Sequence, residues 1–361
     1  MNTINKNKLT IITDNKNWME GNAINQAKDV AKLDGVVEAF AMPDLHAGKT
    51  PVGITVITEG IIYPHLIGTD IGCGMSTYST DIEVSKLKTD KWVKKLNTIK
   101  TLSAVPNENY YPDCPIPDFG SLGAGNHFAE FQVVHKVYDK DALEELGVSI
   151  KELLITAHSG SRSYGAKILQ NYNSYNGYKA DREEAKEYMA VHNDALKWSS
   201  LNRDEAVEKI IAYLGFQKKP VKRLESFHNY LEETGGKFYH RKGSVSSNHN
   251  AVFIAGSRGT LSYIVRPTTK CAEYGYSLAH GSGRKWARSM CKGRVWNKYD
   301  KCSIDIKFNK YQGQLVCHDY DLLFEEAPEA YKNIENIIAI LLEYEMVELI
   351  ASVKPVLTVK A

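Results

Sequence analysis

The pair Asp70 and Cys73 lies in the segment Gly-Thr-Asp-Ile-Gly-Cys-Gly-Met, at residues 68–75. A carboxylate and a thiol three residues apart, with glycines on both sides, are typical of two metal ligands on a tight turn. This donor set suits zinc, manganese, iron or cobalt better than calcium. The segment therefore predicts part of a transition-metal site.

Four histidines stand in polar, glycine-rich or Asn-adjacent settings: His127, His158, His228 and His280. Each alone is a weak signal, because an isolated histidine is more often a surface residue or a satisfied core residue. The set is stronger, since the small and amide neighbours of His158, His228 and His280 let backbone and phosphate come close. With the pair above, the set predicts a mixed Cys, Asp and His ligand group.

The composition is that of an ordinary globular protein. Over 361 residues the formal net charge is only +2, so a nucleic-acid partner must be held by local clusters of Lys and Arg. The chain shows no signal-peptide run and no bilayer-spanning apolar segment, so we expect a cytoplasmic protein with no membrane contact. Five of the six cysteines match no metal or disulfide pattern and are expected as small buried or semi-buried residues: Cys114, Cys271, Cys291, Cys302 and Cys317.

The elements that must position these residues alternate between strands and helices. Short β-branched runs predict strands at Leu9–Ile12, Val52–Ile57, Ile61–Ile67, Leu153–Ala157, Lys237–Tyr239, Ala251–Ala255 and Tyr263–Val265. Periodic or charged runs predict helices at Asn22–Leu33, Thr89–Leu96, Lys179–Tyr213 and Lys222–Glu233, and a long one beginning near Pro328. Tyr110–Phe119 reads as a loop and Val353–Ala361 as an extended tail.

The fold class predicted is α/β, with a large mixed or antiparallel sheet core and surrounding helices. No linker divides the chain, so residues 1–361 are expected to form a single domain. Neither a Walker phosphate loop nor a GxGxxG fingerprint is present, so the chain is not expected to use a standard nucleotide-binding topology.

Nine ordered motifs closely resemble the RtcB family of RNA ligases and span nearly the whole chain. They are Met-Pro-Asp-Leu-His (42–46), the 68–75 segment, Gly-Asn-His-Phe-Ala-Glu (125–130), His-Ser-Gly-Ser-Arg (158–162), His-Asn (228–229), His-Arg-Lys-Gly-Ser (240–244), Gly-Ser-Arg-Gly-Thr-Leu-Ser-Tyr (256–263), His-Gly-Ser-Gly-Arg (280–284) and Val-Lys-Ala (359–361). The resemblance implies a ligase that uses GTP and two Mn²⁺ ions and joins an RNA 3'-phosphate or 2',3'-cyclic phosphate to a 5'-hydroxyl, in RNA repair or tRNA splicing. It also implies the family's own fold. We expect a monomer and leave open an archease-type activator.

The resemblance also assigns roles to residues. His280 falls on the nucleophile that takes GMP. The implied metal ligands are Asp70, Cys73, His127, His158 and His228, with Cys73 bridging two ions. The implied guanine-nucleotide contacts are Asn126, Glu130, Asn229, Ser262 and Lys360, and the implied phosphate contacts are Arg162, Arg284 and Arg288. Without the resemblance, Lys360 would be read as a solvated tail residue.

The residues agree with these roles on chemical grounds. A neutral imidazole can attack a phosphorus atom and leave again, and a thiolate is well suited to lie between two divalent ions. Two alternatives remain open: a two-metal phosphoesterase or nuclease, which would not need His280, and a catalytically idle RNA-end-binding protein. His46 fits either the RNA end or a turn, and Arg241 and Lys242 fit either the RNA backbone or a structural role.

Departures from the family pattern concern the substrate. The chain is short, and its segment between Asp44 and Gly68 looks trimmed. Ser282 stands where Ala is usual, Arg258 replaces the usual Met, and Ser163 and Tyr164 follow the His158 motif in place of a glycine. None removes an implied ligand or the nucleophile, so these changes bear on which RNA is used.

Overall fold

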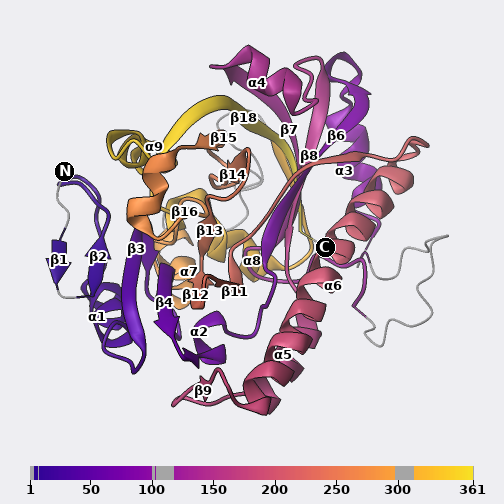
Figure 1. The fold of residues 1–361 in the computed structure, drawn as a ribbon. Helices are drawn as coiled ribbons and strands as arrows, with labels where there is room; N and C mark the ends of the chain where they lie inside the picture. The colour runs from indigo at the N-terminus through magenta and orange to yellow at the C-terminus, as the bar shows by residue number, and fades with distance from the viewer. Residues whose placement is uncertain (1–3, 7, 100–101, 103–117, 297–312, 361) are drawn as a thin grey trace.

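Two large β-sheets, flanked by helices, form the body of the computed structural model, which describes residues 4–6, 8–99, 102, 118–296 and 313–360 (Figure 1). The six-stranded sheet has the order β1 (Ile4–Lys6), β2 (Leu9–Ile11), β3 (Val36–His46), β4 (Val52–Glu59), β12 (Lys237–Lys242) and β11 (Asn229–Thr234). The eight-stranded sheet has the order β10 (Val221–Phe227), β6 (Gly74–Glu83), β8 (Glu152–Ser159), β7 (Phe128–Val137), β18 (Val347–Lys360), β15 (Ser262–Pro267) and β14 (Val252–Ile254), with β17 (Gln314–Cys317) beside β18.

Two small ladders complete the sheets: β13 (Ser244–Ser246) with β16 (Ser277–Ala279), and β5 (Ile61–Ile62) with β9 (Tyr178–Lys179). Among the described strands, the pairings of β2 with β3 and of β17 with β18 are parallel and the others are antiparallel. The predicted class, α/β with a mixed or antiparallel sheet core, is confirmed.

The helices lie around the sheets, with α1 beside the six-stranded sheet and the long α6 on the opposite side of the molecule (Figure 1). They are α1 (Gly21–Val30), α2 (Pro64–Ile67), α3 (Thr89–Leu96), α4 (Lys140–Glu145), α5 (Arg162–Asn171), α6 (Glu183–Leu214), α7 (Arg288–Trp296), α8 (Tyr320–Glu325) and α9 (Ile334–Glu343). Short 3₁₀ turns cover Val84–Lys86, Thr269–Tyr274 and Pro328–Ala330. No helix in the described ranges is long and apolar enough to cross a membrane.

The apolar core joins the two sheets. One buried cluster combines Phe40 and Met42 of β3 with Ile254 of β14 and Ile337 of α9. A second cluster lies under α6 and contains side chains from β7, β8 and β18. Shared burial of this kind favours the expected single domain over residues 1–361, which stays a prediction.

Most predicted elements are confirmed. The strands at Leu9–Ile12, Val52–Ile57, Leu153–Ala157, Lys237–Tyr239, Ala251–Ala255 and Tyr263–Val265 and the helices at Asn22–Leu33, Thr89–Leu96 and Lys179–Tyr213 match described elements within a few residues. Gly215 ends α6 in the left-handed conformation, with φ 96°, as a glycine readily does. The loop prediction at 110–119 falls outside the described residues, except for its last two positions. Cys114 and Cys302 also lie outside the described residues.

The helix predicted over Lys222–Glu233 is wrong. This segment forms β10 and β11, which pair with β6 and β12 and are separated by His228. Burial alternates along the two strands, with Leu224, Ser226, Asn229 and Leu231 buried and the residues between them less so, as on a half-buried strand. Pairing with neighbours distant in sequence overrides the local helix propensity of its Lys, Glu and Leu residues.

Three other predictions need correction. The run Ile61–Ile67 is a strand only over its first two residues, because Pro64 begins α2. The long helix starts at Ile334, where the side chain of Asn333 accepts a hydrogen bond from the Glu335 amide, and Pro328 opens a separate 3₁₀ turn. The expected C-terminal tail is instead β18, which lies inside the eight-stranded sheet between β7 and β15.

Because β18 is an interior strand, its side chains carry much of the packing. Leu357 is completely buried, whereas Leu342 on α9 is 40% exposed. We predict that Leu357→Ala lowers the free energy of unfolding by about 2–5 kcal/mol, and that Leu342→Ala lowers it by less than about 1 kcal/mol. Denaturant-induced unfolding of the two variants measures both values, and equal losses would contradict the interior position of β18.

Candidate active site

Four strand ends of the eight-stranded sheet meet at one edge and bring the predicted metal ligands together. Cys73 immediately precedes β6 and His127 immediately precedes β7, while His158 lies near the end of β8 and His228 follows β10. Neighbouring strands here are antiparallel, so the start of one strand lies beside the end of the next. Residues distant in sequence are thereby placed within reach of one ion.

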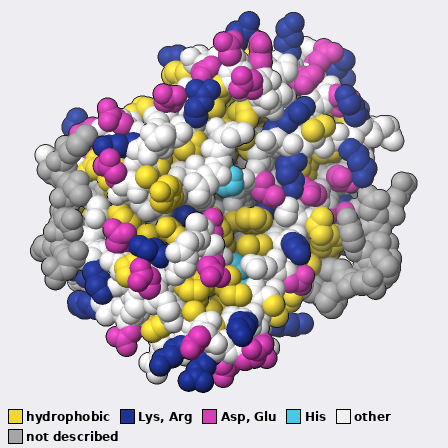
Figure 2. Space-filling model, in the orientation of Figure 1, with side chains coloured by type: hydrophobic (Ala, Val, Ile, Leu, Met, Phe, Trp, Pro, Cys, Tyr) yellow, Lys and Arg dark blue, Asp and Glu magenta, His cyan; other side chains and the backbone are white. Residues whose placement is uncertain are grey.

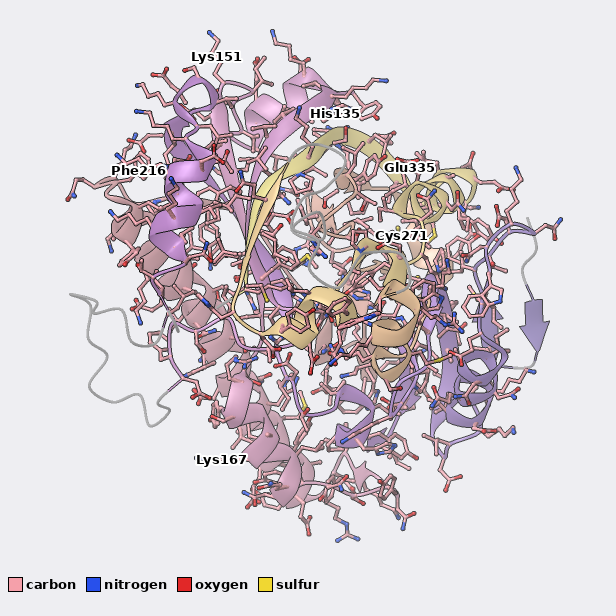
Figure 3. The ribbon with its side chains drawn as sticks, turned by 180° about the vertical axis from the view of Figure 1, so that it is seen from behind. His135, Lys151, Lys167, Phe216, Cys271 and Glu335 are labelled. Carbon is pink, nitrogen blue, oxygen red and sulfur yellow. The ribbon has the colours of Figure 1, made fainter. Side chains whose placement is uncertain are left out.

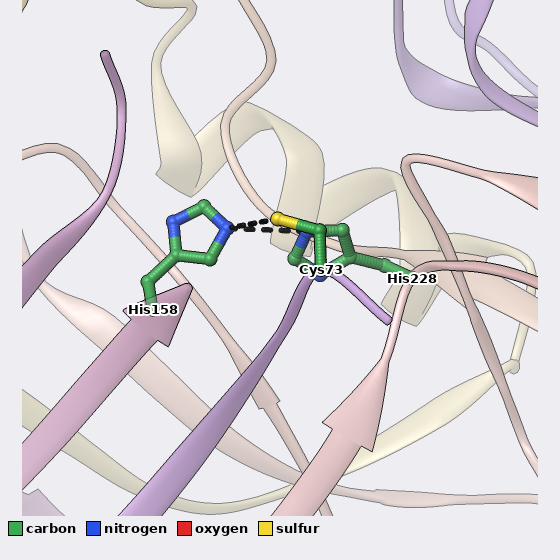
Figure 4. A group of neighbouring side chains, drawn as sticks. All are labelled: Cys73, His158 and His228. Atoms are coloured by element: carbon green, nitrogen blue, oxygen red, sulfur yellow. Dashed lines mark hydrogen bonds between the residues drawn. The ribbon is translucent and has the colours of Figure 1, made fainter. Parts of the chain in front are cut away.

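The five predicted ligands form two groups that share Cys73. Its Sγ lies 3.2 Å from His158 Nε2, which lies 3.2 Å from His228 Nε2 (Figure 4). Cys73 Sγ also lies 3.3 Å from His127 Nε2. Asp70 Oδ2 lies 2.9 Å from His127 Nε2. The ligand atoms of Cys73, His158 and His228, and those of Asp70, Cys73 and His127, lie within 4.8 Å of one another in each group.

Two glycines permit this close approach. Gly72 has φ 72°, a conformation that side chains disfavour, and a Cβ there would clash with the side chain of Ser199. A Cβ at Gly160, two residues after His158, would clash with the carboxylate of Asp70. The glycines around the ligands therefore serve the backbone geometry of the cluster.

The protonation of the first group suits a metal. The carbonyl oxygen of Asn126 lies 3.1 Å from His158 Nδ1 and can only accept, so Nδ1 carries the proton and Nε2 presents a lone pair. Burial, followed by the neighbouring histidines, lowers the pKa of His158 and of His228, which keeps both imidazoles neutral. Burial raises the pKa of Cys73, and a bound metal would remove its proton.

The second group is arranged differently. The guanidinium of Arg162 donates to His127 Nδ1 at 2.8 Å, so His127 Nε2 carries the proton and faces Asp70. Burial opposes ionisation of Asp70, but His127, then the hydrogen bond with Cys73 and the more distant Arg162 outweigh it and lower the pKa of Asp70. Coordination through His127 Nε2 requires that proton to leave and Arg162 to turn away.

The donor set fits a transition-metal ion. Thiol, imidazole and carboxylate side chains converge, all of them buried except the partly exposed Asp70. The Asn126 carbonyl oxygen fixes the orientation of His158, as such second partners do in known metal sites. The metal-ligand roles of Asp70, Cys73, His127, His158 and His228 stay predictions.

A large cavity of about 1250 Å³ opens beside the cluster, and Figure 2 shows a hollow near the middle of the molecular face in which histidine side chains are visible. Its walls contain most of the remaining predicted site residues: Asn126, Glu130, Arg162, Asn229, His280, Arg284, Arg288 and Lys360. Ser262 does not line the cavity. Its hydroxyl accepts a hydrogen bond from the Gly256 amide at 3.0 Å and so supports a loop of the wall from behind.

His280 is held by a carboxylate. Its Nδ1 lies 2.6 Å from Asp44 Oδ2, which also accepts from the His280 amide at 3.2 Å. A carboxylate facing Nδ1 fixes the proton there and leaves Nε2 as the unprotonated nitrogen. The His280 ring lies 4.8 Å from that of His228, measured between centroids, so the candidate nucleophile adjoins the group of predicted metal ligands.

Lys332 ties together the two segments that carry this pair. Its Nζ donates to the carbonyl oxygens of Pro43 and Leu45, at 3.1 and 2.7 Å, on either side of Asp44. Its own amide donates to Gly283, three residues after His280, at 3.0 Å. The geometry of the His280–Asp44 pair thus depends on a lysine that sequence reasoning missed.

Glu130 and Lys360 face the cavity from adjacent strands. The Glu130 carboxylate accepts hydrogen bonds from the Thr358 hydroxyl at 2.6 Å and from the side-chain amide of Gln132 at 2.8 Å. Lys360 donates to the carbonyl oxygens of Gly125 and His127, at 2.9 and 3.0 Å. Burial raises the pKa of Glu130 to about 7 and lowers the pKa of Lys360. Lys360 is therefore part of the wall, in contrast to the solvated residue that its position alone suggests.

The arginines differ in how fully they are engaged. Arg284 donates to Glu326 Oε1 at 3.0 Å and to the Glu325 carbonyl oxygen at 2.7 Å, so a phosphate must displace internal partners to bind it. Arg288 is about half exposed and its Nε lies 3.6 Å from Glu326 Oε1, a longer contact than that of Arg284, so an anion can reach it more easily. The roles of both residues toward phosphate stay predictions.

The two basic residues at 241 and 242 also differ in whether they reach the cavity. Arg241 is buried and bonds to Thr55, Ser277, Tyr230 and Glu232, so its role is structural. Lys242 lines the cavity and donates to the Ile67 carbonyl oxygen at 2.6 Å.

The remaining histidines separate into wall, structural and remote positions. His46 lines the cavity, and its ring centroid lies 6.4 Å from that of His280. His192 and His240 accept backbone hydrogen bonds from Leu231 and Tyr63 and are structural. His135, labelled in Figure 3, is exposed near the far end of β7, eight residues from His127.

Sequence reasoning missed Asp44 and Thr358 as well as Lys332. Asp44 stands inside the Met-Pro-Asp-Leu-His motif, where a carboxylate interrupts an apolar run, and this interruption is the signal that the sequence offers. The structure buries Asp44 completely. No local signal distinguishes Lys332 or Thr358, because their importance comes from strands and turns distant in sequence.

A buried Cys, Asp and His cluster beside a histidine–carboxylate pair, in a cavity with arginine walls, is typical of enzymes that transfer phosphoryl groups with metal ions. The chain matches the family described as tRNA-splicing ligase RtcB over residues 26–113 and 107–361. It is 35% identical to RNA-splicing ligase RtcB2 of Escherichia coli, over 98% of this chain and 95% of that one.

More distant relatives also match over at least 90% of both chains. The RNA-splicing ligase RtcB of Escherichia coli strain K12 is 27% identical over 95% of each chain, and the tRNA-splicing ligase RtcB of Archaeoglobus fulgidus is 25% identical over 93% of this chain and 90% of that one. The chain belongs to the RtcB family of RNA-splicing ligases and is an enzyme of that class.

The raised pKa of Glu130 makes the stability of the protein depend on pH. Between the ordinary Glu pKa of 4.5 and about 7, the unfolded chain loses this proton while the folded chain keeps it. The free energy of unfolding therefore falls as pH rises through this window and levels off above it. We predict that Glu130→Gln removes this loss, so the variant gains on the order of 3 kcal/mol relative to wild type between pH 4.5 and 7.

Denaturant unfolding of both proteins at a series of pH values measures this difference. Glu233→Gln, at an exposed end of β11, serves as the matched control and should follow the wild-type profile. Parallel profiles for wild type and Glu130→Gln would show that Glu130 does not titrate in this window.

Proposed function

We propose that the protein is a GTP- and Mn²⁺-dependent RNA ligase that acts through a histidine–GMP intermediate. It joins RNA ends bearing a 3'-phosphate or 2',3'-cyclic phosphate to ends bearing a 5'-hydroxyl, in RNA repair or tRNA splicing. The family supports the ligase class, and the site of this chain supports the chemistry.

The observation that carries the proposal is the His280–Asp44 pair. With the Nδ1 proton held by Asp44, the lone pair on His280 Nε2 is available to attack the α-phosphorus of GTP. A phosphorus–nitrogen bond forms as the bond to the bridging oxygen breaks, and pyrophosphate leaves. The Asp44 carboxylate stabilises the positive charge that develops on the imidazole.

Two groups of side chains would hold the metal ions: Asp70, Cys73 and His127 for one, and Cys73, His158 and His228 for the other. Bound there, divalent ions neutralise the charge of the triphosphate and of the transferred phosphoryl group. The protein itself would present neutral imidazoles and a carboxylate in fixed positions, because the ends of the strands hold these side chains in place.

Guanine is expected between Glu130 and Lys360. An ionised Glu130 accepts from the N–H groups on the guanine edge, and Lys360 donates to its carbonyl oxygen. Adenine presents the opposite pattern at these positions and leaves buried polar groups unpaired, which is a strong basis for discrimination. Asn126 and Asn229 complete the nucleotide contacts in this proposal.

The RNA ends are expected along the arginine wall. A 2',3'-cyclic phosphate is first opened by water, which breaks the bond to the 2'-oxygen and leaves a 3'-phosphate. The guanylyl group then passes from His280 to the RNA 3'-phosphate, and the 5'-hydroxyl attacks this phosphate and displaces GMP. Arg162 and Arg288 would hold these phosphates, since guanidinium groups match phosphate oxygens in pairs. A metal-dependent phosphoesterase would use the same cluster, but it has no need for an oriented imidazole such as His280.

The bridging role of Cys73 predicts unequal effects on metal content. Cys73→Ala should lose both ions because both groups contain this thiol, whereas His127→Ala should lose one. Metal analysis after dialysis against Mn²⁺ measures the number of ions per chain. Full occupancy in Cys73→Ala would refute the bridging assignment.

The chemistry of the RNA ends gives a second test. A strand with a 3'-phosphate or a 2',3'-cyclic phosphate should be joined to one with a 5'-hydroxyl, and joining should weaken as salt rises. A 5'-phosphate offered with a 3'-hydroxyl should not be joined, because activation falls on the 3'-phosphate. Joining of that pair, or cleavage without a joined product, would place the protein in another class.

Covalent labelling tests the nucleophile. With Mn²⁺ and GTP labelled in its α-phosphate, wild type should acquire a label that mild acid removes and base does not, and ATP should label poorly. His280→Ala should abolish labelling with metal content near that of wild type. His135→Ala, at the far end of β7, is the matched control and should label normally. Label on a lysine, or label retained in His280→Ala, would refute the mechanism.

A further inference from the structure

We propose that Arg203, on α6, is a positioning residue that fixes the ligands Cys73, His158 and His228 relative to one another. The proposal rests on the metal role that the proposed function gives to this group. Arg203 acts through the chain neighbours of the ligands, and its side chain is completely buried.

The guanidinium joins the segments that carry Cys73 and His158. Its Nη1 donates to the carbonyl oxygen of Gly72 at 3.0 Å and to that of Ser159 at 2.7 Å. Gly72 precedes Cys73 and Ser159 follows His158, so one nitrogen links the residues beside both ligands. Loss of either hydrogen bond would move the adjacent peptide, and with it Cys73 or His158.

The same group also contacts the segment that carries His228. The guanidinium carbon lies 5.0 Å from the centroid of the Phe227 ring, over its face, and Phe227 immediately precedes His228. Three ligand-bearing segments therefore meet at one side chain, although they come from β6, β8 and β10.

The other donors lock the plane of the guanidinium. Its Nε donates to Ser76 Oγ at 2.8 Å and its Nη2 to Glu225 Oε1 at 2.9 Å. Glu225 also balances the buried positive charge, which would otherwise disfavour a divalent ion nearby. A planar fork with fixed donor directions can satisfy these partners together, whereas a lysine ammonium cannot span them.

Neighbours on the same face of α6 hold the turns in the same way. The Ser199 hydroxyl lies 3.1 Å from the Ile71 carbonyl oxygen and 2.7 Å from that of Ala195, so its proton is shared between the turn and the helix. Asn202 donates to Ser159 Oγ at 2.9 Å. Residues 199, 202 and 203 are spaced three and four apart, so they lie on one helix face. The face is a support for the ligand turns, with Arg203 as the member that reaches all three segments.

The test compares Arg203→Lys with Arg241→Lys. Both arginines are buried and paired with a glutamate, Glu225 and Glu232 respectively, so both substitutions shorten a buried cation and keep its charge. Mn²⁺ binding to the metal-free proteins is measured by equilibrium dialysis, and Co²⁺ is used as a probe because its absorption reports thiolate coordination.

We expect Arg203→Lys to lower the affinity for one of the two Mn²⁺ ions by about 10- to 100-fold, which is the effect of losing a residue that orients metal ligands. The cobalt–thiolate absorption band should weaken as well. Arg241→Lys should bind both ions as wild type does, even if its thermal stability falls as far. Wild-type affinity in Arg203→Lys, or an equal loss in Arg241→Lys, would overturn the proposal. Wild-type protein that binds no Mn²⁺ would overturn the proposed function together with it.

A milder variant covers the case in which Arg203→Lys does not fold. Ser76→Ala removes one acceptor of the guanidinium and leaves its bonds to Gly72 and Ser159 in place. It should lower the affinity for the same Mn²⁺ ion by about two- to fivefold, which is less than the effect of losing the orienting residue itself. Unchanged Mn²⁺ binding in folded Ser76→Ala would count against the orienting role of Arg203.

Discussion

The site depends on the burial of several polar side chains around one sulfur atom. Cys73 Sγ meets two imidazoles within 3.3 Å, and a third imidazole lies against one of them. Neutral histidines and a thiol can be buried together only if each finds a partner, and here they partner one another. The arrangement requires strand ends and glycine turns that come within contact distance, which the antiparallel edge of the eight-stranded sheet provides.

The second half of the site comes from outside that sheet. His280 follows β16, and Asp44 belongs to β3 of the six-stranded sheet, with Lys332 linking their two segments. The cavity therefore takes its predicted metal ligands from the eight-stranded sheet and its oriented imidazole from outside that sheet, and the two adjoin at His228 and His280. Packing between the two sheets, through the cluster that contains Phe40 and Ile254, sets the distance between them. The proposed chemistry therefore depends on the packing of the core.

Sequence reasoning succeeded where the signal was local. The glycine-flanked Asp70–Cys73 pair and the periodic α6 could be recognised from spacing alone, and the ordered motifs identified the family. It failed where distant partners decide the structure: the strands on either side of His228 looked helical, and the C-terminal residues looked like a tail until their pairing with β7 was known. The bonds of Arg284 to residues 325 and 326 could not be foreseen from its motif either, and its role toward phosphate stays a prediction.

The central claim is that Cys73 is shared by two metal ions at the edge of the sheet. Anomalous diffraction at the manganese absorption edge, from crystals grown with Mn²⁺, tests it most directly. The account predicts two peaks about 3.5–4 Å apart, both within bonding distance of Cys73 Sγ. A single peak, or two peaks with Cys73 bound to neither, would contradict it.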